Sequence, residues 1–396
     1  MSIHVTDPLD LAALRRVVEP VESAAGLPNV FYVDPAAQAL ERKVLFLDGW
    51  AAAGFAHDVA QAGDACPIDY LGIPLLLVRD RDGAVRVFQN TCRHRGMILV
   101  GEKTRLRGMI RCPYHSWCYD LEGRLRSTPH VGGPGRNLHE AVDRALLGLI
   151  EVRSHVWQGV VFVNVSGDAA PFEEWAAPLQ SRWSQFEQPA HFGGADSTFE
   201  LDVACNWKLA VENYCESYHL PWVHPGLNSY SRLEDHYHIV AHAQGERAGF
   251  AGQGTTVYDP QLSGDEAFPD FADLDAQWDR QAEYIALFPN VLLGVHRDHR
   301  FAIVLMPQGP ERTIERIAIA YAAPDATGDG FAALRERNTA LWREVFEEDV
   351  FVVEGMQRGR HGPLFDGGRF SPAMDEPTWA FHRWAASRFL GNASAA

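Results

Sequence analysis

The chain has little cysteine, no long apolar run and no basic block. Its 396 residues include only six cysteines, which are too scattered for a disulfide framework, so we expect ligand or core roles for them in a reducing compartment. Nowhere do 18 apolar residues run together, and the first 20 residues lack a basic segment followed by an apolar one. We therefore expect no membrane span, no secretory leader and a cytoplasmic protein.

Acidic residues outnumber basic ones along the chain. The 52 Asp and Glu against 35 Lys and Arg give a net charge of −17, which is spread along the chain without a basic block. Such a chain is a poor partner for nucleic acid or for an anionic membrane surface, so we expect neither. A hydrophobic content of 46% is ordinary for a folded protein, and the length is sufficient for two domains.

The apolar pattern divides the chain into three parts. Residues 1–45 show helical spacing and predict a helical segment that packs on the last part. Residues 46–165 form short β-type runs broken by Gly, Asp and Asn, which predicts an all-β domain. Residues 166–396 mix strands with helices. The fold class is therefore α+β.

Three features are expected within the last part. Residues 290–323 read as a hairpin of half-buried strands, and a long helix follows from about Gly330 to Gln357. The segment 243–275 is rich in Gly, Asp and Ala and predicts an extended loop.

Two short motifs in the all-β part combine thiols with imidazoles. Cys92 and His94 stand one residue apart, and Cys112 and His115 follow after 17 residues. A [2Fe–2S] centre with two Cys on one iron and two His on the other requires this pattern. A structural Cys₂His₂ zinc site is the alternative, but zinc sites usually group Cys with Cys and His with His. The mixed halves favour the iron–sulfur cluster.

A second group of candidate ligands lies in the stretch CESYHLPWVHPG. His219 and His224 are separated by Pro221, which we expect to break the helix and bring the two imidazoles together. Glu212, Glu216 and His219 have i, i+4, i+7 spacing and are predicted to share one helical face. Two imidazoles and one carboxylate form the facial triad of non-haem Fe(II) oxygenases. The alternative is a pair of surface or core histidines.

The third ligand is expected from the late helix. Asp349 falls within an apolar stripe that includes Trp342, Phe346 and Val353, whereas Glu348 falls on a face that looks solvated. A carboxylate forced into a buried face must be paired or bound to metal. We predict Asp349 as the ligand, with Glu348 as the second choice.

These motifs resemble those of Rieske oxygenase α subunits. The resemblance rests on CRHRG, CPYHSW, the Glu-Asn…Tyr-His-x₄-His block and the late acidic helix, and it covers nearly the whole chain. It implies a Rieske [2Fe–2S] domain, a helix-grip catalytic domain with mononuclear Fe(II), and a separate NAD(P)H-dependent reductase, possibly with a ferredoxin. It also implies head-to-tail assembly, commonly as a trimer. In that assembly Glu216 bridges a cluster histidine and an iron histidine of two subunits, and Asn213 faces the iron pocket.

The surroundings of the cluster differ from those in respiratory Rieske proteins. Those proteins have a disulfide between the two loops, whereas this chain has Met97 and Tyr114 at the corresponding places. They also have a serine that is hydrogen-bonded to the cluster, where this chain has Trp117. Fewer hydrogen bonds to sulfur imply a lower potential. Ser116 replaces the family's usual glycine.

The bridging position gives the substrate expectation. Most ring-hydroxylating members have Asp there, and a Glu resembles the branch that acts on quaternary amines such as carnitine, choline and glycine betaine. The chain has 11 Trp, 11 Tyr and 21 Phe, which could form a cage for a methylated ammonium group, and Trp222 is expected nearest the pocket. The alternatives are an aromatic-ring hydroxylating mono- or dioxygenase and, in another class, a Rieske electron-transfer protein.

Overall fold

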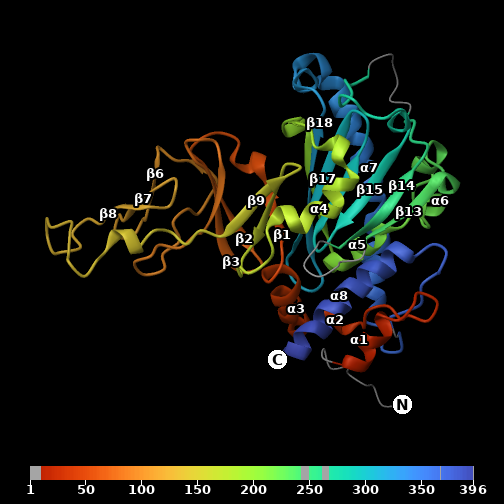
Figure 1. Ribbon diagram of the computed structural model, residues 1–396, viewed down its shortest axis with the longest axis horizontal. Helices are drawn as coiled ribbons and strands as arrows, with labels where there is room; N and C mark the ends of the chain where they lie inside the picture. The colour runs from red at the N-terminus through yellow and green to blue at the C-terminus, as the bar shows by residue number, and fades with distance from the viewer. Residues whose placement is uncertain (1–9, 242–248, 261–266, 366, 396) are drawn as a thin grey trace. The chain divides into compact units, whose positions relative to one another are not determined.

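The computed structural model describes residues 10–241, 249–260, 267–365 and 367–395 (Figure 1). It separates into two compact units, one of residues 52–168 and one of residues 1–51 with 169–396. The smaller unit is built from strands and the larger one from a sheet with helices. The predicted α+β class is therefore confirmed. No helix of the described residues is long and apolar enough to cross a membrane.

The smaller unit contains three antiparallel sheets. One sheet has the order β1-β10-β9, the second β4-β3-β2-β5 and the third β6-β7-β8. The strands are β1 (Ala51–Phe55), β2 (Asp64–Tyr70), β3 (Ile73–Arg79), β4 (Val85–Gln89), β5 (Thr104–Arg105), β6 (Met109–Arg111), β7 (Cys118–Asp120), β8 (Leu125–Ser127), β9 (Arg153–Trp157) and β10 (Val160–Asn164). The second and third sheets enclose a core in which Phe88, Trp117 and Tyr119 pack around Cys92 and Cys112. The two thiols are thus fixed by the same packing that stabilises the sheets.

The larger unit is built on an antiparallel sheet of eight strands. Its order is β11-β18-β17-β16-β15-β14-β13, with β12 also paired to β18. The strands are β11 (His191–Phe192), β12 (Thr198–Val203), β13 (His236–Ala241), β14 (Phe250–Thr255), β15 (Ala282–Leu287), β16 (Val291–Val295), β17 (His299–Pro307) and β18 (Thr313–Tyr321). Residues 291–321 form consecutive antiparallel pairs, as the sequence predicts. Their residues are more deeply buried than the half-buried pattern suggested, because helices also cover the sheet.

Helices pack on this sheet and on one another. They are α1 (Leu11–Val17), α2 (Val30–Val33), α3 (Pro35–Glu41), α4 (Phe172–Arg182), α5 (Trp207–Cys215), α6 (Leu220–Val223), α7 (Ala332–Gly359) and α8 (Glu376–Ala395). Figure 1 shows α5, α7 and α8 gathered around the sheet, and α1 contacts α8. Helix α5 begins at Trp207 because the Asn206 side chain caps it by accepting from the Lys208 N–H. Helix α7 lies within two residues of the predicted range at each end.

One sequence expectation about local structure is corrected. Part of the predicted loop 243–275 is strand β14 (Phe250–Thr255), whose Gly252 and Gly254 suit close packing against Tyr284 and Tyr237. Residues 242–248 and 261–266 of that loop lie outside the described residues. Glycine is poor in ordinary strands, and this is why the sequence pattern concealed β14.

A buried charge network connects the N-terminal segment to the helices. The Glu212 carboxylate on α5 accepts from the Tyr32 hydroxyl at 2.5 Å and from Arg360 at 3.2 Å, and His382 Nε2 lies 3.2 Å away. Burial favours the neutral acid, but the charges of His382 and Arg360 outweigh it and lower the pKa of Glu212 to about 2. Nearby, the buried Lys208 ammonium pairs with Glu41. The contacts of Glu212 thus join α2, α5, the end of α7 and α8.

Glu212→Gln should destabilise the protein by about 3–5 kcal/mol at pH 7, because Arg360 keeps its buried charge while losing its partner. Urea unfolding measures the difference. Because the folded pKa of Glu212 lies below its unfolded value near 4.5, the stabilisation is present above that pH and is lost as the pH falls towards 2. The gap between wild type and variant should therefore narrow below pH 4.5.

Glu200→Gln provides the control for Glu212→Gln. The Glu200 side chain is 61% exposed and pairs with Arg316 at 3.0 Å on the surface, so its loss should cost no more than about 1 kcal/mol. Equal effects of the two changes would contradict the role of the buried network.

Candidate metal centres and substrate cavity

Two loops of the smaller unit have the same backbone fold around their cysteines. The Cys92 N–H donates to Met97 O at 2.8 Å, and the Gly96 N–H donates to Cys92 O at 3.0 Å. In the second loop, the Cys112 N–H donates to Trp117 O at 2.8 Å and the Ser116 N–H to Cys112 O at 3.1 Å. Each loop is therefore a closed turn that presents one thiol and one imidazole.

The four predicted cluster residues converge. Cys92 and Cys112 are 2% and 1% exposed, whereas His94 and His115 lie toward the surface. The two imidazoles face each other with their Nδ1 atoms 3.2 Å apart, close enough to bind the same metal ion. Burial and the neighbouring His115 keep the pKa of His94 below its usual value, which favours the neutral ring that a metal ion binds. Two buried thiols and two neighbouring imidazoles fit a [2Fe–2S] cluster of the Rieske type.

Ser116 occupies a position that favours glycine. The fifth residue of each turn, Gly96 in the first and Ser116 in the second, has a positive φ, 77° and 56° respectively. A side chain at such an angle costs about 1 kcal/mol. This strain explains why glycine is the family's usual residue at that place.

A hydrogen bond to a cluster sulfur was missed by the sequence argument. The Tyr119 hydroxyl on β7 accepts from the Arg93 N–H at 3.1 Å and lies 3.3 Å from Cys92 Sγ. Because its lone pair serves Arg93, its proton is free to point at the sulfur, which as a thiolate ligand can only accept. The cluster therefore has one more hydrogen bond to sulfur than the sequence indicated.

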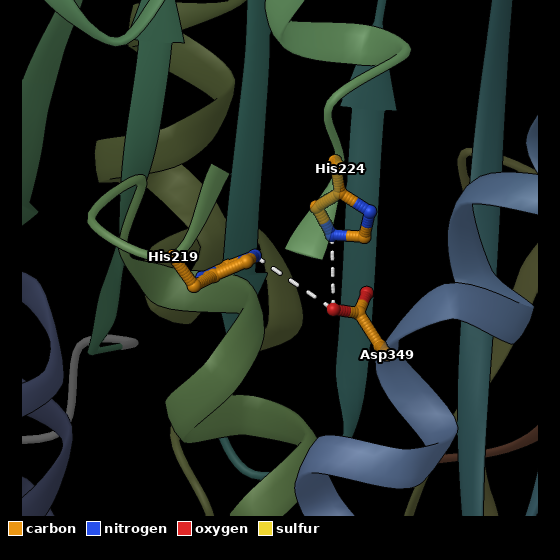
Figure 2. Close-up of side chains that lie close together, drawn as sticks. All are labelled: His219, His224 and Asp349. Atoms are coloured by element: carbon orange, nitrogen blue, oxygen red, sulfur yellow. Dashed lines mark ion pairs between the residues drawn. The ribbon is translucent and has the colours of Figure 1, made fainter. Parts of the chain in front are cut away.

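The second set of predicted ligands also converges, in the larger unit. Figure 2 shows His219 and His224 turned toward Asp349 of α7. Asp349 Oδ1 lies 2.9 Å from His224 Nε2 and 3.7 Å from His219 Nε2. This oxygen is buried and makes no hydrogen bond of good geometry within the described residues, so a cation suits it better than a proton donor does. The three side chains could hold one metal ion, and two imidazoles with one carboxylate suit Fe(II).

The outer nitrogen of each imidazole is held by a further carboxylate. Glu216 Oε1 lies 2.6 Å from His219 Nδ1, and Glu348 Oε2 lies 2.8 Å from His224 Nδ1. Such partners fix the ring orientation and increase the basicity of the Nε2 atoms that face the metal position. Glu348 is therefore not on a solvated face as expected. Glu348 contacts Nδ1 of His224, whereas Asp349 contacts Nε2 of the same ring.

The helix carrying this site breaks earlier than the sequence suggested. Helix α5 ends at Cys215, and Glu216 has extended dihedrals of −121° and 158°. Pro221 stands in the first turn of the separate short helix α6, where proline is favoured, so it begins a helix and does not break one. Glu212 and Glu216 therefore do not share a helical face. Glu212 belongs to the buried network and Glu216 to the metal site.

Protons compete with a metal ion at this site. Burial disfavours charge on His224, but the nearby carboxylates of Asp349 and Glu348 outweigh it and raise the pKa of the imidazole. A metal ion binds only the neutral ring, so its affinity should weaken as the pH falls.

A cavity of about 440 Å³, including its open mouth, adjoins the three side chains. Its lining includes the predicted Asn213 and a group of aromatic rings. The lining residues are Asn213, Tyr214, His219, Leu220, His224, Leu227, His236, Gln253, Tyr284, Phe301, Trp342, Val345, Phe346 and Asp349. Among these described residues there is no lysine or arginine. The cavity wall is thus largely apolar and aromatic, with the Asp349 carboxylate at the metal position.

Two stacked histidines hold the aromatic wall in place. His296 and His299 have parallel rings 4.3 Å apart. The Trp342 indole N–H donates to His299 Nε2 at 3.0 Å, so the other nitrogen of His299 carries the proton and donates to Asp298 at 2.6 Å. His296 Nε2 lies 3.2 Å from the Tyr284 hydroxyl. Sequence reasoning missed these residues, since nothing in the hairpin pattern shows what its turn contacts.

Trp222 does not lie where the sequence argument put it. Its side chain is 71% exposed, packs against Tyr218 and is not part of the cavity lining. Position 222 lies between the two histidines in sequence, but α6 directs His219 and His224 inward and Trp222 outward. The expectation that Trp222 lies nearest the pocket is therefore corrected, and Trp342 takes that place.

A cluster site in one unit and a non-haem iron donor set in the other occur together in the Rieske oxygenases. Residues 194–391, half of the chain, match the family model "Ring hydroxylating alpha subunit (catalytic domain)", and residues 49–141 match the model "Rieske [2Fe-2S] domain". The chain belongs to the ring-hydroxylating alpha subunit family. The resemblance drawn from the motifs is confirmed.

Individual relatives agree with this assignment. The carnitine monooxygenase oxygenase subunit of Escherichia coli K12 is 26% identical over 344 residues, which cover 85% of each chain. The chloroplastic choline monooxygenase of Arabidopsis thaliana is 26% identical over 381 residues, 92% of this chain and 82% of the relative. The crystal structure of the quaternary ammonium Rieske monooxygenase CntA with γ-butyrobetaine shares the fold, with a TM-score of 0.71, 20% identity and 97% and 99% coverage.

The family defines the enzyme and its cofactors. The chain is the terminal oxygenase component of a Rieske non-haem iron oxygenase, with a Rieske [2Fe–2S] cluster and a mononuclear iron as cofactors. Enzymes of this family receive electrons from a separate reductase. The electron-transfer protein considered as an alternative is excluded, because the catalytic domain is present.

Tyr119→Phe should lower the midpoint potential of the cluster by roughly 40–60 mV, since one hydrogen bond to sulfur worth about 1 kcal/mol is lost and 59 mV corresponds to a tenfold change for one electron. A redox titration followed by visible absorbance measures the shift. Tyr114→Phe is the matched control, because it removes a nearby exposed hydroxyl that contacts Arg95 and no sulfur. If both variants keep the wild-type potential, the Tyr119 proton does not point at Cys92.

Asp349→Ala should abolish binding of the mononuclear iron and turnover while leaving the visible spectrum of the cluster unchanged. Metal analysis and absorbance of the purified variant test this. Glu347→Ala is the control on the same helix, since Glu347 is exposed and lies 3.8 Å from Arg343. A bleached cluster in Asp349→Ala would refute the separate placement of the two metal sites.

Proposed function

We propose that the chain hydroxylates a quaternary or otherwise methylated amine at the cavity beside His219, His224 and Asp349. The supporting observation is the cavity itself, with Tyr284, Phe301, Trp342 and Phe346 in its wall and no cationic side chain among its described lining residues. Aromatic faces attract a methylated ammonium group by cation–π interaction, and a lining without positive charge does not repel it.

The relatives support the same substrate class. By their names, the compared oxygenases act on carnitine and choline, which both carry a trimethylammonium group. The bridging Glu216 in place of Asp supports it as well. The similarity in fold, at 20% identity, does not choose between substrates, so the sequence relatives and the cavity carry the proposal.

The roles of the metal-site residues follow from the donor sets. Cys92, His94, Cys112 and His115 hold the Rieske cluster. His219, His224 and Asp349 hold the iron, which when bound supplies oxygen activation, while the cluster supplies electrons. Asn213 faces the substrate position from α5.

Glu216 is assigned to the coupling of the two centres. In a head-to-tail homotrimer, the carboxylate that holds His219 Nδ1 would also reach a cluster histidine of a neighbouring subunit. The reductase would use NAD(P)H, with or without a ferredoxin. A reducing cytoplasmic location agrees with the six cysteines, none of which forms a disulfide in the described residues.

The reaction inserts one oxygen atom into a C–H bond next to nitrogen. Substrate, O₂, two electrons and two protons give the hydroxylated amine and water. A hydroxyl on the carbon attached to nitrogen makes the C–N bond labile, so the amine and an aldehyde are then released. An aromatic substrate would instead give a phenol or a cis-diol, and this alternative is an outcome of the test.

The protein should convert a methylated amine when supplied with NADH and a surrogate reductase. The panel contains carnitine, choline, glycine betaine and γ-butyrobetaine, with benzoate and naphthalene as aromatic controls. Oxygen uptake matched by product, measured by mass spectrometry, supports the proposal. Turnover of the aromatic compounds alone would overturn it in favour of ring hydroxylation.

A further inference from the structure

A chain of three hydrogen bonds ends on the residue that holds His219. Ser231 Oγ lies 3.0 Å from His236 Nε2, and His236 Nδ1 lies 2.6 Å from Gln253 Oε1. The Gln253 Nε2 group donates to the backbone carbonyl of Glu216 at 3.0 Å. Ser231 and Gln253 are buried, and His236 and Gln253 line the cavity. None of these residues is a predicted metal ligand.

The Glu216 carbonyl, the last group in this chain, fixes the direction of all three hydrogen bonds. The Glu216 carbonyl can only accept, so the Gln253 amide nitrogen faces it and the amide oxygen faces His236. That oxygen can only accept, so His236 carries its proton on Nδ1 and its Nε2 lone pair accepts from the Ser231 hydroxyl. Burial keeps the pKa of His236 low, which agrees with the neutral ring.

Glu216 is held at both of its ends by these contacts. It stands where α5 has ended, in extended backbone without a helical hydrogen bond for its carbonyl, and Gln253 supplies the donor. Its carboxylate accepts from the N–H groups of Tyr218 and His219 and holds His219 Nδ1. A shift of the carbonyl therefore moves the carboxylate and the imidazole together.

The donor is placed by the strands and not by the metal-site loop. His236 and Gln253 lie on the paired strands β13 and β14, where His238 is opposite Gln253. Gly252 and Gly254 flank Gln253, and the space above them is filled by Tyr284 and Tyr237. The sheet thus presents a rigid amide to a loop that has no regular structure of its own.

We propose that His236 and Gln253 are positioning residues that set the Glu216–His219 pair, and through it the metal affinity of the iron site and the rate at which the reduced cluster is re-oxidised. The second effect rests on the proposed bridging function of Glu216. The first does not, because metal affinity is measured without substrate or turnover.

Gln253→Glu is the sharpest test, because it changes one amide nitrogen into an oxygen with almost no change in shape. One carboxylate oxygen still accepts from His236, but the other faces the Glu216 carbonyl and cannot donate. Fe(II) is titrated calorimetrically into protein that keeps its cluster after removal of the mononuclear iron. We expect about tenfold weaker affinity, the size of effect typical for loss of an outer hydrogen bond at a metal site.

Controls separate positioning from general damage. Gln277→Glu adds the same charge at an exposed position and should leave Fe(II) affinity at the wild-type value. If Gln253→Glu does not fold, Gln253→Met removes the donor without adding charge and should show the same loss. His236→Leu should weaken affinity, and His236→Asn should restore it, since the Asn amide can replace the Nδ1–H donor. Wild-type affinity in both Gln253 variants would overturn the proposal.

A double-mutant cycle identifies the route of the effect. In the Glu216→Gln background the carboxylate that contacts His219 Nδ1 is already removed, so Gln253 can no longer act through it. Gln253→Glu should then change Fe(II) affinity by less than about twofold. A full tenfold effect in that background would show that Gln253 acts by another route and would overturn the proposal.

Single-turnover oxidation of the pre-reduced cluster gives the kinetic readout. With substrate and oxygen present, Gln253→Glu should slow the return of the oxidised spectrum about tenfold, and Gln277→Glu should not. Slow re-oxidation in the wild type with every amine tested would count against the proposed substrate and not against the positioning role, for which the affinity series remains decisive.

Discussion

The geometry of the iron site depends on one buried oxygen, Asp349 Oδ1, toward which two imidazoles converge. Helix α7 must place this atom within reach of His219 and His224, which come from the short irregular segment after α5. The contact between α5 and α7 on the sheet makes this possible. A carboxylate with two imidazoles at that position needs a cation, so the packing of two helices and the binding of a metal are parts of the same arrangement.

Carboxylates then act in two different ways around α5. Glu212, four residues before Glu216, is compensated by Arg360 and His382 and fastens the N-terminal segment to α5, α7 and α8. Glu216 and Glu348 are instead turned to the outer nitrogens of the metal-facing imidazoles. The end of α5 at Cys215 separates these roles, because an unbroken helix would carry Glu216 onto the face of Glu212. Helix termination is therefore a functional feature of this chain.

Sequence and structure agree where the pattern is local or the chemistry is strict. The four cluster residues, the two histidines and Asp349 were all predicted from residue type and spacing, and the structure brings the two cluster histidines together and the three iron-site residues together. A role for Glu216 beside a metal-binding histidine was expected from the resemblance, and Glu216 and His219 are only three residues apart in sequence. The contacts made by Glu348, Tyr119, Gln253 and His299 were not found. Each of these contacts joins residues more than 15 positions apart. The contact of Glu348 also depends on which face of α7 is turned to His224.

The sequence by itself determined the cofactor chemistry, because thiol, imidazole and carboxylate donors at fixed short spacings restrict the metal that can bind. It also determined the long helix and the hairpin strands, whose periodicity is local. Only the tertiary structure decided the cavity. Trp342 and Tyr284 form part of its wall because α7 packs on the sheet. Trp222 lies outside it because α6 turns that side chain to the surface. The physical reason is that burial and hydrogen-bond partners depend on elements distant in sequence, whereas ligand type and periodicity are properties of neighbouring residues.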